Sequence, residues 1–191
     1  MTKNKSLLII LYSYALALIS TIIFINLYNN ENLMLTLFYA DIIATIIIYL
    51  SSYIFKNSSI IDPYWSVAPP LLLLFWIVKT DSVNIINTFI LSTSILFWSI
   101  RLTYNWFRNW NGLDQEDWRY IELKGKFGKY YQIINFLGIH LFTSLIVFSC
   151  CMPFKYIVEK QITNISIIIG FIICFIGVLY EIIADQQLYN F

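Results

Sequence analysis

The feature of this sequence that most constrains its fold is a series of long apolar blocks. An α-helix rises about 1.5 Å per residue, so about 20 apolar residues cross the roughly 30 Å of hydrocarbon in a bilayer. Hydrophobic residues make up 59% of the chain and charged residues 12%, against about 25% charged in a usual soluble domain. We therefore predict an all-α membrane protein, a single domain over residues 1–191 that forms a bundle of about six transmembrane helices. The five long blocks are Leu7–Leu27, Leu33–Phe55, Val83–Leu102, Ile133–Met152 and Ile162–Ile183.

A sixth block, Ser66–Val78, is shorter than the others. As a helix it would be about 20 Å long, which is short for a full crossing. It either crosses with help from the aromatic residues that flank it, or it enters the membrane and returns. We expect Pro69 and Pro70 in its first turn, where a missing N–H has little effect on helix stability.

The distribution of lysine and arginine predicts the orientation, because cytoplasmic loops are enriched in these residues. If six helices cross, most of the 12 lysines and arginines lie on one side. That side includes the N-terminus and the segment Thr103–Gln132, which we therefore place in the cytoplasm. Its members are Lys3, Lys5, Lys56, Arg101, Arg108, Arg119, Lys124, Lys126 and Lys129, and the other side has Lys79, Lys155 and Lys160.

Several classes of partner are not expected. The formal net charge is +1, and a nucleic-acid partner would require a basic face. His140 is the only histidine and has no Cys or Glu at ligand spacing beside it, so we expect no metal site. The three cysteines lie in apolar blocks and are interpreted as small hydrophobic residues. The expected partners are the lipid bilayer and a hydrophobic small molecule, and the sequence does not indicate an oligomeric state.

Asp41 lies inside the second apolar block. An ionised carboxylate near the middle of a bilayer costs about 3 kcal/mol or more, so Asp41 has to face protein or water. Thr45, Tyr49 and Ser52 follow at helical spacing and form one polar stripe with it. The stripe is interpreted either as a hydrogen bond between packed helices or as the lining of a cavity.

Asp62 is followed by a proline and two aromatic residues, in the order Asp62-Pro-Tyr-Trp-Ser. Aspartate before proline is typical of a turn or a helix cap. The alternative is functional, because a carboxylate beside aromatic rings at the rim of a cavity can hold a lipid-like substrate and a proton donor together.

Arg101, Asn105 and Arg108 share one helix face if the fourth helix continues past the membrane edge. Arginines held by carboxylates suit a fixed anion such as phosphate, and the alternative is a structural ion network. The charged residues that follow this face are Asp114, Glu116, Asp117 and Arg119.

Glu181 and Asp185 are four residues apart near the end of the last block, so both carboxylates lie on one face and repel each other unless donors share them. The donors are expected to be the preceding arginines or the hydroxyl and amide groups of a nucleotide. Helix capping is a poor explanation, because acidic side chains are unfavourable at a helix C-terminus.

Four segments together resemble one known family. They are Asp62-Pro-Tyr-Trp-Ser, Arg101-Leu-Thr-Tyr-Asn-Trp, Glu116-Asp-Trp-Arg-Tyr120 and Glu181-Ile-Ile-Ala-Asp185-Gln. Their order and spacing along most of the chain are similar to the uncharacterised branch of the steroid 5-alpha-reductase superfamily. The resemblance implies a helical-bundle oxidoreductase that binds NADPH at the cytoplasmic side and reduces a carbon–carbon double bond in a steroid or other lipid. No G-x-G-x-x-G motif is present, which excludes a Rossmann site.

The resemblance also assigns roles to residues. It implies that Asp62 is a catalytic acid, with Tyr104 as its candidate partner. The residues expected to bind the cofactor are Arg101, Asn105, Arg108, Arg119, Glu181 and Asp185. We expect Asp62, Arg108 and Asp185 to converge on one cavity that faces the cytoplasm.

The family usually continues beyond the Glu181–Asp185 motif into a basic loop and further helices, so we expect the chain to be incomplete at its C-terminal end. Two alternatives to a reductase stay open. One is a membrane methyltransferase-like relative, whose cofactor motifs would lie in the missing part. The other is a non-catalytic membrane scaffold or pore, which a continuous water path along Asp41 would favour.

Overall fold

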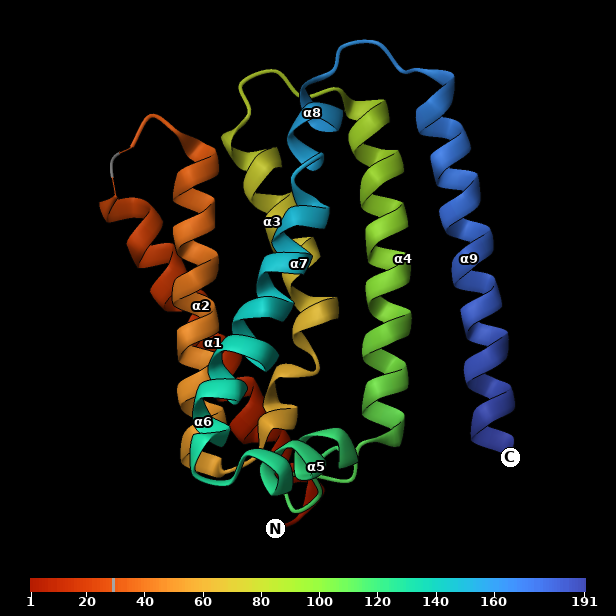
Figure 1. Ribbon diagram of the computed structural model, residues 1–191. Helices are drawn as coiled ribbons and strands as arrows, with labels where there is room; N and C mark the ends of the chain where they lie inside the picture. Colours follow the sequence, from red (N-terminus) through yellow and green to blue (C-terminus); the bar gives the residue numbers. More distant parts are fainter. Residues whose placement is uncertain (29) are drawn as a thin grey trace. The chain divides into compact units, whose positions relative to one another are not determined.

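The computed structural model describes residues 1–28 and 30–191, and this part of the chain is helical without any strand (Figure 1). Six of its helical segments are long and apolar enough to cross a membrane, which confirms an all-α multi-pass membrane protein. The elements are α1 (Lys3–Leu27), α2 (Leu33–Phe55), η1 (Ser58–Ile61), α3 (Tyr64–Lys79), α4 (Ile85–Asn109), α5 (Trp118–Phe127), η2 (Gly128–Tyr130), α6 (Tyr131–Ile134), η3 (Asn135–Leu141), α7 (Phe142–Cys151), α8 (Phe154–Glu159) and α9 (Ile165–Asn190).

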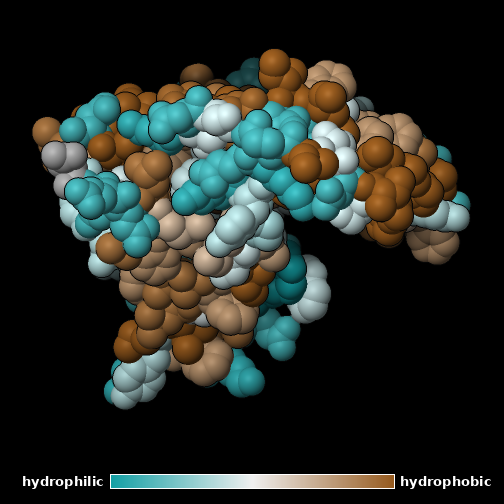
Figure 2. Space-filling view, turned by 90° about the horizontal axis from the view of Figure 1, so that it is seen from above, coloured by the Kyte–Doolittle hydropathy of each residue, from teal (hydrophilic) through white to brown (hydrophobic). Residues whose placement is uncertain are grey.

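The chain divides into two compact units, and each is described by itself. Unit 1 contains Met1–Tyr64 and Trp110–Phe148, and unit 2 contains Trp65–Asn109 and Ser149–Phe191. The prediction of a single domain stays a prediction. Figure 2 shows hydrophilic side chains gathered on the face toward the viewer and large groups of hydrophobic side chains around them, as expected for a protein whose helices lie in lipid.

In unit 1, α1 packs along α2, and η1 packs against α2, which it follows in the chain. The hydroxyl of Tyr14 on α1 donates to the carbonyl of Ile60 at 3.0 Å. The Asn57 side chain donates to the carbonyls of Leu113 and Gln115 at 2.8 and 2.9 Å. These bonds connect the turn after α2 to the segment that leads into α5, so the polar end of unit 1 is held together by backbone acceptors.

In unit 2, α4 packs against α8 and α9. The Asn87 side chain near the start of α4 donates to the carbonyl of Lys160 at 2.8 Å, which connects this helix to the loop before α9. Near the other end of α4, Thr103 donates to the hydroxyl of Ser66 at 2.9 Å. The beginning of α3 therefore lies beside the end of α4.

The short third block is a continuous helix, and together with η1 it forms the candidate span Ser58–Lys79. It does not fold back on itself, so the structure favours the crossing alternative over the re-entrant one. The expected position of the prolines was wrong. The helix already begins at Tyr64, because the restricted φ of Pro63 suits the start of a helix, and Pro69 and Pro70 therefore lie in its interior.

Helices α4 and α9 continue beyond their apolar blocks, to Asn109 and Asn190. Arg101, Asn105 and Arg108 therefore all lie within one continuous helix, as their predicted shared face requires. Polar side chains do not interrupt a helix that leaves the membrane, because water and other side chains satisfy them there.

Candidate functional site

The polar ends of α4 and α9 form an ion cluster in unit 2. Arg101 donates through Nη1 to Oδ2 of Asp185 at 2.5 Å, and its Nη2 lies 2.7 Å from Oε2 of Glu181. The Arg101 side chain is only 11% exposed. A single guanidinium thus neutralises the two carboxylates that the sequence places on one face, and it offsets their mutual repulsion.

Arg108 lies further along α4 and contacts the same face of α9. It donates to Oε1 of Gln186 at 2.8 Å and to the carbonyl of Asp185 at 3.2 Å. Another donor of the same guanidinium reaches Oδ1 of Asn105 at 3.2 Å. The group also lies 4.1 Å from the centre of the Tyr189 ring, a distance typical of a cation–π contact. Arg108 is therefore held in place by neutral groups, and it forms no ion pair with a carboxylate of the described residues.

Asp62 lies in unit 1, between η1 and α3. Its backbone N–H donates to the carbonyl of Ser59 at 3.1 Å, so it caps η1 as the turn interpretation requires. Its side chain is half-buried and accepts a hydrogen bond from the hydroxyl of Tyr120 at 2.8 Å. Both interpretations of Asp62 remain compatible with its position, since the cap uses the backbone and leaves the carboxylate available.

Arg119 lies at the start of α5 in unit 1. Its Nε and Nη2 donate to the two carboxylate oxygens of Asp117 at 2.8 and 2.7 Å, and Asp117 also caps α5 by accepting from the Arg119 N–H at 2.9 Å. These bonds from Arg119 hold the pKa of Asp117 below its usual value. The side chain of Arg119 is largely exposed, so the described structure assigns it to a helix-capping ion pair.

The polar stripe on α2 is buried. The side chain of Asp41 accepts a hydrogen bond from the Tyr64 hydroxyl, and Thr45 shares a 2.5 Å hydrogen bond with Ser144 on α7. Asp41 is only 5% exposed and one of its oxygens has no partner among the described residues. At Asp41 and Thr45, the stripe therefore forms hydrogen bonds with neighbouring helices, as the packing interpretation expects.

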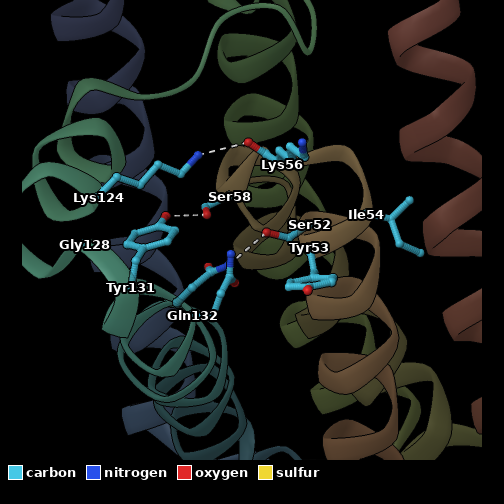
Figure 3. A pocket seen from close by; sticks show the side chains of 10 residues that line it. Ser52, Tyr53, Ile54, Lys56, Ser58, Lys124, Gly128, Tyr131 and Gln132 are labelled. Atoms are coloured by element: carbon cyan, nitrogen blue, oxygen red, sulfur yellow. Dashed lines mark hydrogen bonds between the residues drawn. The ribbon is translucent and has the colours of Figure 1, made fainter.

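A cavity of about 620 Å³ lies in unit 1, where α2 ends (Figure 3). Of the predicted stripe, only Ser52 lines it, and none of the eight predicted site residues does. The cavity is lined by Ser52, Tyr53, Ile54, Lys56, Ser58, Lys124, Gly128, Tyr131, Gln132 and Asn135.

The structure brings together five of the predicted site residues, all in unit 2: Arg101, Asn105, Arg108, Glu181 and Asp185. Tyr104 on the same helix also reaches this group, because the Arg108 guanidinium lies 5.7 Å from the centre of its ring, and its side chain is 61% exposed. Because Asp62 and Arg119 belong to unit 1, the expected convergence of Asp62 with Arg108 and Asp185 stays a prediction.

Sequence reasoning missed two partners of these residues. Tyr120 binds Asp62, and Tyr189 stacks on Arg108. Tyr189 follows Asp185 by four positions, so helical spacing alone places it on the same face. No comparable signal connects Tyr120 with Asp62, because this contact joins separate helical segments.

Comparison with known proteins gave one match. A family described as "Protein of unknown function (DUF1295)" matches residues 48–191, which include all eight predicted site residues. No curated protein and no solved structure matches the chain.

Proposed function

Because the chain belongs to the DUF1295 family, we propose that it is a membrane reductase of the steroid 5-alpha-reductase type, which uses NADPH to reduce a carbon–carbon double bond in a steroid or other lipid. The observation that carries the proposal is the ion cluster of α4 and α9. Arg101 pairs with the carboxylates of Glu181 and Asp185, and Arg108 binds the Asp185 backbone carbonyl beside them, at the positions that the family resemblance assigns to the cofactor.

The residues of this cluster suit a dinucleotide phosphate. The Nε atoms of Arg101 and Arg108 are buried and have no partner among the described residues, so each guanidinium retains a donor. Arginine is well suited to phosphate, because its planar group binds two oxygens at once. Arg108 is the better candidate for this role, since Arg101 is already occupied by two carboxylates. Glu181 is about half exposed and can accept hydrogen bonds from ribose hydroxyls.

The bound cofactor would supply the hydride that reduces the double bond. Asp62 and Tyr120 would supply the proton side of the reaction. The Tyr120 hydroxyl donates its one hydrogen to Asp62, which orients the phenol before substrate binds. With Asp62 protonated, the carboxyl group would donate to the Tyr120 oxygen instead, and the phenol hydrogen would be free to polarise a conjugated carbonyl oxygen and to be transferred to the substrate while Asp62 replaces it. We therefore propose Tyr120 in place of Tyr104 as the partner of Asp62.

The test is a titration of the purified protein with NADPH. Binding is measured by fluorescence energy transfer from tryptophan to the nicotinamide. We expect Arg108→Ala to weaken binding by about tenfold or more, because a hydrogen bond to a charged group is worth about 1.5–3 kcal/mol. Lys160→Ala removes one charge from the loop before α9 and serves as the matched control within the same unit.

Two results would contradict the proposal: no NADPH binding by the unaltered protein, or equal binding by the two variants. Binding of S-adenosylmethionine instead of NADPH would indicate the methyltransferase-like alternative.

A further inference from the structure

The cavity at the end of α2 has a basic lining that the proposed reductase site does not use. Two lysines line it and no carboxylate does (Figure 3). Its remaining lining is rich in hydroxyl and amide groups, which come from α2, η1 and the α6–η3 segment. Its volume of about 620 Å³ is within the range of small-molecule sites. We propose that this cavity binds the phosphate group of a phosphate ester, with Lys56 as the main cation.

Lys56 occupies a backbone conformation that normally selects glycine. Its φ is +54°, the one positive φ of a non-glycine residue in the described part of the chain. The Lys56 N–H donates to the carbonyl of Tyr53 at 3.3 Å, and the Asn57 N–H donates to that of Ser52 at 3.1 Å. These two bonds are a Schellman motif, and glycine is the usual residue at the position of Lys56. Such strain often accompanies functional positions, because the side chain is retained for another reason.

The positive charge of Lys56 is not balanced within unit 1. The other lysine of the cavity, Lys124, donates to the carbonyl of Lys56 at 3.0 Å and also pairs with Glu116. Glu116 is nearly buried and accepts from the Ser58 N–H as well, so it compensates the charge of Lys124. Lys56 forms no ion pair with a described residue. One net positive charge therefore remains at the cavity, and a phosphate would neutralise it.

The wall of the cavity offers groups for the rest of such a ligand. Asn135 is only 1% exposed, and its Oδ1 has no partner among the described residues. Its Nδ2 already donates to Ser52 and Gln132, at 3.3 and 3.2 Å. A buried acceptor without a donor is unfavourable, because it has lost its hydrogen bonds to water. A ligand hydroxyl beside the phosphate would satisfy it, as in a glycerol phosphodiester.

The position of the cavity suits a ligand from the membrane. Tyr53 and Ile54 are exposed, line the cavity and belong to the last turn of a span, so an acyl chain could lie against them while the phosphate reaches Lys56. A soluble phosphate ester presents the same group, and the experiment separates the two sources.

The key variant is Lys56→Gly, which removes the cation and at the same time places the preferred residue in the Schellman motif. We expect its melting temperature to be equal to or higher than that of the unaltered protein, and its affinity for the phosphate group to fall about tenfold. Lys126→Ala is the matched control, because it removes one charge from α5 without changing the cavity lining. The measurement is native mass spectrometry of the full-length protein in detergent with phosphatidylglycerol or phosphatidylcholine, with and without millimolar inorganic phosphate.

Preferential retention of phosphatidylglycerol that Lys56→Gly abolishes, and that inorganic phosphate does not displace, would identify a lipid headgroup. Displacement by inorganic phosphate would identify a soluble ester as the source. Equal retention of the two lipids, together with no effect of Lys56→Gly or of inorganic phosphate, would overturn the proposal. NADPH binding should be unchanged in Lys56→Gly, so this result is independent of the proposed reductase function.

Discussion

At the scale of single residues, Arg101 decides whether the polar end of unit 2 is stable. Glu181 and Asp185 are neighbours on α9, and no other described cation pairs with them. Arginine is required at this position because its fork reaches both carboxylates at once, which a lysine ammonium does less well.

We expect Arg101→Met to destabilise the protein by about 1–3 kcal/mol, because two carboxylates are left without a partner at a partly buried site. Adding Glu181→Gln and Asp185→Asn to this variant should restore most of the loss. The measurement is thermal unfolding in detergent. If the triple variant were no more stable than Arg101→Met, packing of the arginine stem rather than charge would be the cause.

Asp41 depends on Tyr64 in the same way, inside the membrane-spanning part of unit 1. We expect Tyr64→Phe to lower the free energy of unfolding by about 1–3 kcal/mol, since the buried carboxylate loses its side-chain hydrogen bond. In an Asp41→Ala background the same substitution should have a much smaller effect. Thermal unfolding in detergent measures the effect of Tyr64→Phe in each background. Equal effects in both backgrounds would show that Tyr64 and Asp41 are not energetically coupled.

At the scale of elements, the ends of helices carry most of the polar structure. Asp117 caps α5 with its side chain, Lys56 closes α2 in a left-handed conformation, and Asp62 follows η1. The apolar blocks contain few groups of this kind, so the positions where helices end determine where chemistry can occur.

The cap of α5 should depend on pH. Arg119 holds the pKa of Asp117 in the folded protein below its usual value. The contribution of the Asp117 carboxylate to stability is therefore fully present above the pKa of the unfolded chain, about 3.9, and is lost as the pH falls through the lower pKa of the folded protein. Above pH 5 we expect Asp117→Ala to destabilise the protein by about 1 kcal/mol, and near pH 3 by less. Thermal unfolding at both pH values measures the difference. Asp81→Ala, in an exposed loop, is the control, and a loss independent of pH would contradict the role of the charge.

At the scale of the whole molecule, the helix flanks are the dominant surface. Val178 is the only buried residue of α9 among its 26 residues, and most of the other side chains on this helix are apolar. In a soluble protein such a helix would aggregate, whereas in a bilayer the lipid covers it. This exposure supports the conclusion that the protein is integral to the membrane.

The predicted orientation can be tested on intact cells with a membrane-impermeant maleimide. In a background without Cys150, Cys151 and Cys174, we expect Lys126→Cys to react only after the cells are permeabilised. Asp81→Cys, in the loop between α3 and α4, should react in intact cells. The reverse pattern would invert the orientation, and reaction of both variants from one side would contradict an odd number of crossings between them.

Two features were predictable from the sequence because they depend on short stretches of chain. The spans follow from length and hydrophobicity alone, and α2 has the bounds Leu33–Phe55 that its apolar block predicts. Helical spacing likewise predicts that Arg101, Asn105 and Arg108 share a face, as do Glu181 and Asp185. By contrast, the start of α3 was misplaced, since hydrophobicity does not show where a helix begins outside its apolar part.

The contacts between distant segments were decided only by the tertiary structure. Arg101 and Asp185 are 84 positions apart, and the pairing of Asp62 with Tyr120 joins segments 58 positions apart. The cavity beside Lys56 requires α2, α5 and the α6–η3 segment together. The periodicity of one helix shows which of its faces is polar, but not which other helix packs against that face. That choice depends on the summed packing of all the helices, and it alone turns separate charged residues into a site.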